Sequence, residues 1–271
     1  MAFPLMQEHG FLGASIEEGR VMSYIAETPL DEAISGACLY DLTGNLYRFF
    51  SGDAAQSYAE ALCASQKLEA GSCTFTAVLT GDGALVSVPL LVRGGEHEYI
   101  VIDAGSRREA LGAWMGFIST VEQGGRAPYA SVSIEDASSL LVPLLICGKR
   151  AEELVRDYTA DQTLPKPGMV ASIAFDGVPC VLARLGRLPE DAFIVFAPPA
   201  FATKLFRSFL SFQYVHPQGM DSLAQLLGEL PWAEALSGDD RIVIPRDTLL
   251  RWGIVRPETD FIGARGLSEQ S

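Results

Sequence analysis

Two periodicities alternate along the chain. Short apolar runs such as YRFF (47–50) and LLVPLLIC (140–147), bounded by Gly and polar residues, predict strands. In residues 51–62 the apolar side chains instead recur at helical spacing, at Ala55, Tyr58, Ala59 and Leu62. We therefore predict a helix directly after the strand YRFF.

One pattern of apolar and polar positions occurs twice in the sequence. Residues 83–102 overlie residues 177–196 without a gap, which places Glu96 and Glu190 94 residues apart. Each copy reads as a turn, a strand, an acidic loop and a second apolar strand. Internal repeats indicate duplicated architecture, although generic hairpins can resemble one another by chance.

The repeat continues upstream, where residues 51–62 parallel residues 147–158 with Gly52 and Gly148 96 apart. Each half then reads strand, helix, three strands, helix. Short strands joined by G-D-G and D-G turns favour antiparallel hairpins, so the predicted class is α+β, with pseudo-duplicated antiparallel sheets and packed helices. We predict a lobe over 51–129 inserted in residues 1–50 and 130–271, with a ligand cleft between similar lobes.

Downstream of the repeat, GMDSLAQLLGEL (219–230) predicts a helix, and DRIVIPRDTLLRWGIVRP (240–257) a strand and a covering segment.

The amino-acid composition argues against several classes of binding partner. The 271 residues carry 34 acidic and 20 basic side chains, a net charge of −14, which argues against nucleic-acid and anionic-membrane partners. The longest apolar run is about half a membrane span, and the N-terminus lacks the basic start of a secretory signal, so we expect a cytoplasmic protein.

The cysteines and histidines, which are the residue types that form disulfides or bind metals, are scattered along the chain. Five cysteines without C-x-x-C spacing suggest buried small apolar side chains, and three isolated histidines predict no metal site. The common nucleotide-binding and hydrolase motifs do not occur.

Five segments in order resemble the aminomethyltransferase family, typified by the T-protein of the glycine cleavage system. CLYDLTGNLYRFFSGDAA resembles its G-[LV]-F-D-[VL]-S-H-M-G-x-[IL]-x-[VL]-x-G-x-D-A segment, and LARLGRLPEDAFIVFAP its A-R-T-G-Y-T-G-E-D-G-[FY]-E-[IL] segment. The other three segments lie at 74–92, 219–230 and 244–263.

The resemblance implies a tetrahydrofolate-binding fold with folate in a central opening. Members of the family transfer an aminomethyl group from a lipoyl carrier to tetrahydrofolate and release ammonia, and relatives demethylate other one-carbon donors. A second branch, whose members assist iron–sulfur enzymes, carries K-G-C-Y-x-G-Q-E, and this chain has no matching Cys or Gln.

Several family site positions are changed. The first aspartate of the family's pair, expected beside the folate nitrogens, falls on Ser87, which has a hydroxyl but no charge. The S-H-M-G loop becomes residues 43–46 with Asn45, and the first residue of the Asn-rich segment becomes Asp103. Ala224 replaces an arginine that would pair with folate's carboxylates. The catalytic residue is left open.

At three other positions, the residues suit the roles that the resemblance implies for the folate site. Glu190 falls where the family's glutamate binds the pterin ring, Arg184 holds the family's arginine position, and Phe75 would form an apolar wall. Each has a structural alternative: Glu190 as a solvated loop charge, Arg184 as an ion-pair partner, and Phe75 as a core aromatic.

Two functions remain open. One is a folate-dependent aminomethyl or methyl transferase in which a partner subunit supplies the site residues that this chain lacks. The other is a catalytically degenerate folate-binding or assembly module. The chain ends near where the family's C-terminal β-barrel domain would begin, so we expect a homodimer or partner to cover an exposed face that includes Trp232 and Trp252.

Overall fold

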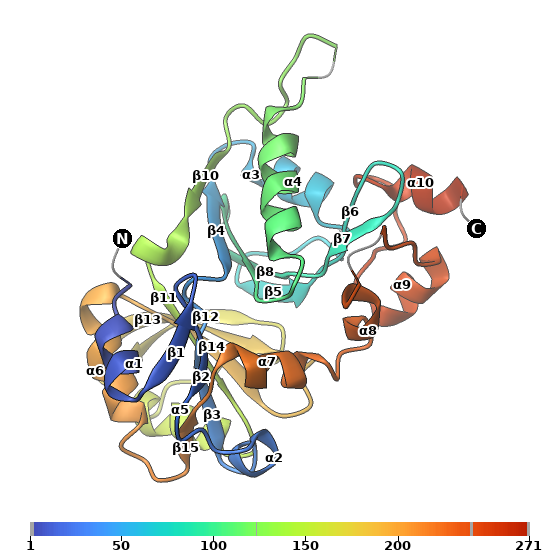
Figure 1. The fold of residues 1–271 in the computed structure, drawn as a ribbon. Coiled ribbons are helices and arrows are strands. Elements are labelled where there is room, and N and C mark those ends of the chain that lie inside the picture. The colour runs from blue at the N-terminus through green and yellow to red at the C-terminus, as the bar shows by residue number, and fades with distance from the viewer. Residues whose placement is uncertain (1–2, 123, 239–240, 270–271) are drawn as a thin grey trace. The chain divides into compact units, whose positions relative to one another are not determined.

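The computed structural model describes residues 3–122, 124–238 and 241–269. The chain divides into two compact units (Figure 1). Unit 1 comprises Met1–Asn45 and Ala137–Leu230, and unit 2 comprises Leu46–Asp136 and Pro231–Ser271. The predicted lobes, 51–129 and the remainder, stay a prediction about domain organisation.

Unit 1 is built on a six-stranded sheet in the order β12-β13-β14-β11-β3-β15. Its strands are β3 (Ala37–Asp41), β11 (Val142–Cys147), β12 (Val170–Phe175), β13 (Val178–Leu185), β14 (Ala192–Ala197) and β15 (Val215–Pro217). Neighbours are antiparallel except β15 and β3, which are parallel. The tight β12–β13 turn confirms the hairpin predicted at the D-G dipeptide.

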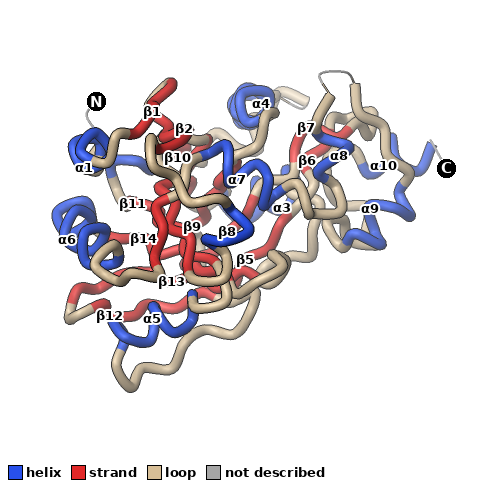
Figure 2. The backbone as a smooth tube through the Cα atoms, turned by 60° about the horizontal axis from the view of Figure 1, so that its bottom comes forward, coloured by secondary structure: helices blue, strands red, loops and turns tan. Residues whose placement is uncertain are grey.

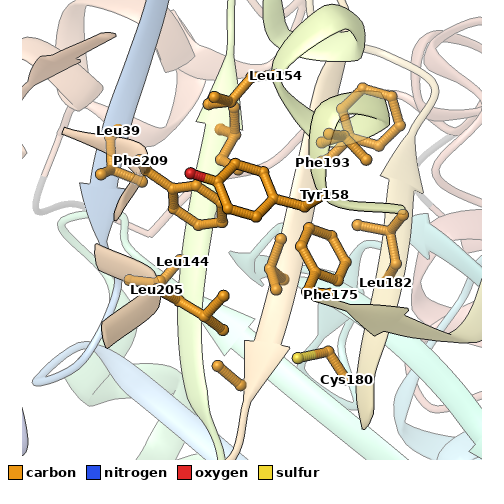
Figure 3. Packing of buried hydrophobic residues seen from close by; sticks show 14 of the residues in the cluster. Leu39, Leu144, Leu154, Tyr158, Phe175, Cys180, Leu182, Phe193, Leu205 and Phe209 are labelled. Atoms are coloured by element: carbon orange, nitrogen blue, oxygen red, sulfur yellow. The ribbon is translucent and has the colours of Figure 1, made fainter. Parts of the chain in front are cut away.

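Helices α5 (Ala151–Thr159) and α6 (Pro199–Phe209) cover one face of this sheet (Figure 2). Alternate residues of β11 and β14 point into the core that they share, as strand periodicity requires. Figure 3 shows the packing, with Tyr158 of α5 and Phe209 of α6 in edge-to-face contact, their ring centroids 4.9 Å apart. The smaller elements of unit 1 are α1 (Met6–Phe11), β1 (Ala14–Glu17), β2 (Arg20–Tyr24), α2 (Leu30–Ala33), the 3-10 turn Ala137–Ser139 and α7 (Met220–Leu227).

Unit 2, like unit 1, is built on a sheet packed against two helices. Its sheet has five antiparallel strands in the order β10-β4-β9-β8-β5. Its strands are β4 (Leu46–Ser51), β5 (Ser72–Phe75), β8 (Leu90–Gly95), β9 (Glu98–Asp103) and β10 (Ser133–Asp136), with a separate hairpin of β6 (Val78–Leu79) and β7 (Leu85–Ser87). Helices α3 (Ala55–Leu62) and α4 (Arg108–Thr120) bury their apolar faces in its core. The C-terminal helices are α8 (Ala233–Leu236), α9 (Arg246–Trp252) and α10 (Ala264–Glu269).

The duplication is confirmed in the positions of the elements. Strand β4 and helix α3 start 96 residues before β11 and α5, and β9 starts 94 residues before β14. Both offsets match those in the sequence.

The gap-free overlay of 83–102 on 177–196 is wrong in detail. Arg93 lies opposite Tyr99 across β8 and β9, and Arg184 lies opposite Phe193 across β13 and β14, so the two arginines correspond although they are 91 residues apart. The loop after Arg184 is therefore three residues longer than the loop after Arg93. Glu190 lies in the longer loop.

The repeat also begins earlier than the sequence indicated. Strand β3 precedes β4 in the chain but pairs with β11, and β10 precedes β11 but pairs with β4. Strands β3 and β10 start 96 residues apart, so they belong to the repeat. Each repeat thus gives its first strand to the sheet of the other.

Two predictions about individual elements are wrong. The first repeat has five short strands between its helices, because two of its strands are interrupted, one at Thr76–Ala77 and the other at Val88–Pro89. The strand predicted after residue 240 is reduced in the described residues to one bridge between Ile242 and Leu85, followed by α9.

The remaining predictions on individual residues have mixed outcomes. All five cysteines are buried, as predicted. Trp232 is only 3% exposed and lies against Phe75, so it does not belong to an exposed face. Across the described residues, no helix combines the length and apolarity needed to cross a membrane.

Candidate functional site

Unit 1 contains a cavity of about 730 Å³, within the size range of small-molecule sites. Its walls come from the segment around α2, from α7 and from the β13–β14 loop. The lining residues are Ser23, Glu27, Thr28, Pro29, Leu30, Asp31, Ile34, Pro189, Glu190, Gln218, Asp221, Ser222, Gln225, Leu226 and Glu229. Glu190 is therefore the predicted ligand-binding residue that faces this cavity.

The longer β13–β14 loop positions Glu190. Pro189 restricts the backbone just before it, and the loop closes where β14 resumes at Ala192. Among the described residues, none donates a hydrogen bond to the Glu190 carboxylate or forms an ion pair with it. The carboxylate is half-buried and its oxygens remain available as acceptors.

A hydrogen-bonded network fixes another wall. The Gln218 side-chain amide donates to the Thr28 carbonyl oxygen at 2.8 Å, and the Ser222 hydroxyl donates to Gln218 Oε1. The Tyr40 hydroxyl lies 3.2 Å from Ser222 Oγ. These side chains are locked by one another, which gives the cavity a preformed polar surface.

Glu27 has a structural role in the same wall. Its carboxylate accepts the backbone N–H groups of Tyr24 at 2.7 Å and of Gly219 at 3.0 Å. Gly219 precedes α7, so Glu27 places a negative charge at the start of that helix, where the backbone dipole favours it.

The cavity is acidic. Its described lining includes five carboxylates, no Lys and no Arg. Such a surface suits a ligand that presents N–H donors or positive charge, and it provides no counter-charge for an anionic ligand.

Arg184 and Glu190 share the β13–β14 hairpin, but the contacts of Arg184 are within the protein. Its guanidinium forms ion pairs with Glu152 at 2.7 Å and Asp191 at 2.6 Å, and lies 5.0 Å from the centroid of the Phe193 ring. Arg184 is thus an ion-pair partner within the protein, which is the structural alternative given for it above.

In unit 2 the structure brings Ser87 and Asp103 together. The Ser87 hydroxyl donates to Asp103 Oδ2 at 2.5 Å, and the Gly105 N–H donates to Asp103 Oδ1 at 2.8 Å. Burial raises the pKa of Asp103, although the hydrogen bonds from Ser87 and Gly105 and the charge of Arg108 act in the opposite direction. Position 87 lacks a carboxylate, but Asp103 supplies one beside it.

Phe75 and Asn45 have different surroundings. Phe75, in unit 2, is 9% exposed, and its ring centroid lies 5.5 Å from that of Trp232. Asn45, in unit 1, donates from Nδ2 to the Leu42 carbonyl oxygen at 3.0 Å and to Met220 Sδ at 3.3 Å. Asn45 Oδ1 is buried and has no hydrogen-bond partner among the described residues.

The sequence interpretation missed most of the cavity wall. Asp221 and Ser222 belong to the segment GMDSLAQLLGEL, which was identified only as a helix, and Gln218 directly precedes it. The periodicity of that segment was the available signal, because polar residues at the start of an amphipathic helix can line a cavity. Their arrangement with Thr28, 190 residues away from Gln218, could not be read from local pattern.

Comparison with known proteins identifies the family of the chain. The family model described as "GCVT N-terminal domain" matches residues 23–228. The chain is 24% identical over 241 residues to an aminomethyltransferase of Listeria innocua, covering 86% of this chain and 63% of that protein. It is 25% identical over 279 residues to an aminomethyltransferase of Rubrobacter xylanophilus, covering 98% and 72% respectively.

A solved structure has the same fold. The glycine cleavage system aminomethyltransferase T from Bartonella henselae superposes with a TM-score of 0.75 and 18% sequence identity, covering 98% of this chain and 73% of that one. The predicted family and the predicted α+β fold class are therefore confirmed. The family model spans most of the chain, and the chain belongs to the GCVT N-terminal domain family.

Proposed function

We propose that the chain binds tetrahydrofolate and takes part in transferring an aminomethyl or methyl group to it. The observation that carries this proposal is Glu190, whose carboxylate has no partner among the described residues and lies on the wall of a cavity of about 730 Å³. Membership of the GCVT N-terminal domain family supports it. The aminomethyltransferases of Listeria and Rubrobacter point to the same class of chemistry.

The residues present fit the pterin part of the cofactor. A pterin ring carries an exocyclic amine and a ring N–H that can donate side by side to one carboxylate, and such charge-assisted bonds are about twice as strong as neutral ones. Glu190 supplies that acceptor, while Gln218 and Ser222 form a fixed polar wall. When bound, tetrahydrofolate supplies the nitrogen that receives the one-carbon group.

The cavity does not fit the cofactor's glutamate tail equally well. No Lys or Arg lies among its described lining residues, so the tail's carboxylates have no counter-charge there. This observation favours the second candidate function, a catalytically degenerate binding or assembly module that works with a partner subunit or a second copy.

Calorimetric titration with reduced tetrahydrofolate tests the first candidate. We expect binding to the wild-type protein and a loss of about 10- to 100-fold in affinity for Glu190→Gln, because an amide cannot accept two N–H donors with a full charge. Glu229→Gln is the matched control, because it removes one charge from the same cavity. The affinity of this variant for tetrahydrofolate should stay within about threefold of the wild-type value.

Three results separate the candidates. No binding by the wild-type protein at millimolar tetrahydrofolate would refute the folate proposal and leave the assembly module. Equal weakening by both variants would mean that Glu190 acts through general charge rather than direct contact. Folate-dependent release of ammonia from an aminomethylated lipoyl carrier would establish transfer and exclude a purely non-enzymatic role.

A further inference from the structure

Two cysteines lie directly opposite each other in the sheet of unit 1, Cys38 on β3 and Cys147 on β11. Their side chains are 0% and 1% exposed, and both are free thiols in this structure. Each thiol is within hydrogen-bonding reach of the other. The other three cysteines of the chain have apolar residues as their strand partners.

The register of β3 and β11 fits a disulfide between these two thiols. Next to the paired residues of these strands, the Leu42 N–H donates to the carbonyl oxygen of Pro143, which lies opposite it. Cys38 and Cys147 lie an even number of positions away, so they too form a hydrogen-bonded pair, with Cα atoms about 5.5 Å apart. Disulfides join Cα atoms roughly 4.4–6.8 Å apart, so the backbone already has a suitable spacing.

The two thiols point away from the helices α5 and α6. Strand residues alternate between the faces of a sheet, and the neighbouring Leu39 and Ile146 belong to the core that those helices cover. Tyr40 shares the face of the two thiols, and its hydroxyl lies 3.2 Å from Oγ of Ser222, a residue of the cavity wall. The thiol pair therefore lies behind the wall of the unit 1 cavity.

The two thiols differ in acidity. The hydrogen bond from Cys147 lowers the pKa of the Cys38 thiol, against the effect of burial, and the Tyr40 hydroxyl acts in the same direction as Cys147. Donation of that hydrogen bond, together with burial, raises the pKa of the Cys147 thiol. Because the thiolate is the reactive form, Cys38 is the residue that attacks an oxidant first.

Metal binding is a poor alternative for this pair. Across the residues that the structure describes, no group of three or more Cys, His, Asp or Glu side chains is placed to hold a metal ion. Two thiols in contact without a third ligand are instead suited to thiol–disulfide chemistry.

We propose that Cys38 and Cys147 form a reversible intrachain disulfide when hydrogen peroxide oxidises the protein. The Cys38 thiolate attacks one peroxide oxygen, the O–O bond breaks, and a sulfenic acid and hydroxide form. The hydroxide becomes water with the proton that Cys38 released. The Cys147 sulfur then attacks the sulfenic sulfur, the S–O bond breaks, and the oxygen leaves as water with the Cys147 proton. Two thiols are oxidised while one peroxide is reduced to two waters.

The bond would join the two chain segments that build unit 1, Met1–Asn45 and Ala137–Leu230, which are separated in sequence by residues 46–136. The Cβ atoms of a hydrogen-bonded pair are about 5.5 Å apart, whereas a disulfide holds them roughly 3.5–4.5 Å apart. The strands must therefore be drawn together, and the resulting strain makes the bond easier to reduce. We expect millimolar reduced glutathione to reverse it.

Peptide mapping of the full chain tests this proposal. The folded protein is treated with hydrogen peroxide and alkylated at once in denaturant. Trypsin then releases Cys38 in residues 21–48 and Cys147 in residues 127–149, and neither peptide contains another cysteine. We expect these two peptides to be linked, to lack about 2 Da relative to their sum, and to separate after incubation of the folded protein with reduced glutathione.

Two variants sharpen the test. Cys147→Ser should abolish the link and leave Cys38 as a sulfenic acid that dimedone captures. Cys180→Ser is the matched control, because it removes another buried cysteine of the same sheet, and it should form the link at a rate within about twofold of wild type. Thermal unfolding shows whether each variant is folded, and the wild-type map decides the question without any substitution.

Two outcomes would overturn the inference. One is full alkylation of both peptides after peroxide treatment of the folded protein, and the other is a link between either peptide and a different cysteine in preference to its strand partner. A link that reduced glutathione leaves intact would refute its reversibility. None of these measurements involves tetrahydrofolate, so their result is independent of the proposed function.

Discussion

The Arg184 guanidinium lies 5.0 Å from the centroid of the Phe193 ring, its partner across β13 and β14. The first repeat contains the same relationship between Arg93 and Tyr99, at 5.3 Å. Each arginine also reaches the preceding helix of its own repeat, Arg184 at Glu152 of α5 and Arg93 at Gln56 of α3. The pair is therefore a structural clamp between hairpin and helix that was kept in both copies.

This clamp predicts measurable coupling between Arg184 and Glu152. A double-mutant cycle with Arg184→Gln and Glu152→Gln, followed by urea unfolding, should give a coupling energy of about 1 kcal/mol, because both side chains are partly shielded from solvent. The more exposed pair Arg150 and Glu153 is the control and should give about 0.3 kcal/mol. Equal coupling in the two pairs would contradict a special role for the clamp.

A second prediction concerns Arg256, whose side chain is only 1% exposed. Its guanidinium donates to the carbonyl oxygens of Glu60, Cys63 and Ser65, which ties the C-terminal segment of unit 2 to the end of α3. Arg256→Met should lower the free energy of unfolding by about 3 kcal/mol or more, because these buried carbonyls lose their donors.

The matched control for Arg256 is Arg265→Ala, since Arg265 is almost fully exposed and forms an i,i+4 ion pair with Glu269 through its Nε. Its effect should stay within about 0.5 kcal/mol in chemical denaturation. A small effect at Arg256 would show that the segment is held mainly by apolar packing.

A third prediction concerns stability in acid. The hydrogen bond from Lys67, with a further contribution from Arg256, lowers the pKa of Asp260 to about 2. Because the unfolded value is about 3.9, Asp260 stabilises the fold fully above that pH, and the contribution disappears as the pH falls toward 2. Asp260 is 48% exposed, so solvent screening keeps the effect near or below about 1 kcal/mol.

Urea unfolding of wild type and Asp260→Asn between pH 6 and pH 2 measures this term. The difference in unfolding free energy should be largest above pH 4 and should shrink toward pH 2. Glu258→Gln, an exposed carboxylate on the same segment, is the control. A difference for Asp260→Asn that did not change with pH would rule out the proposed linkage.

The fourth prediction uses backbone strain at Ala160, the residue that ends α5 with φ of 48° and ψ of −130°. An L side chain rarely adopts this conformation, whereas glycine does so without steric cost. Ala160→Gly should therefore stabilise the protein by about 1 kcal/mol in thermal unfolding. The same substitution at exposed Ala110, inside α4, should destabilise it by about 1 kcal/mol.

Sequence reasoning reached some of the candidate site but not its geometry. It identified Glu190, Ser87 and Asp103 as separate positions, and it treated Ser87 as the loss of a charge. Only the structure shows that Asp103 provides a carboxylate 2.5 Å from Ser87 Oγ. The two residues lie on different strands, and no local pattern encodes which strands place their ends together.

The sequence by itself determined the α+β class, the duplication with its 94- and 96-residue offsets, and the family. These properties depend on periodicity, turn residues and motif order, which are local or repeated along the chain. The tertiary structure decided the exchange of β3 and β10 between the sheets, the three-residue-longer loop that carries Glu190, and the ion pairs of Arg184. Strand pairing and side-chain partners depend on contacts between residues distant in sequence, where burial and hydrogen bonding select one arrangement among many with the same local pattern.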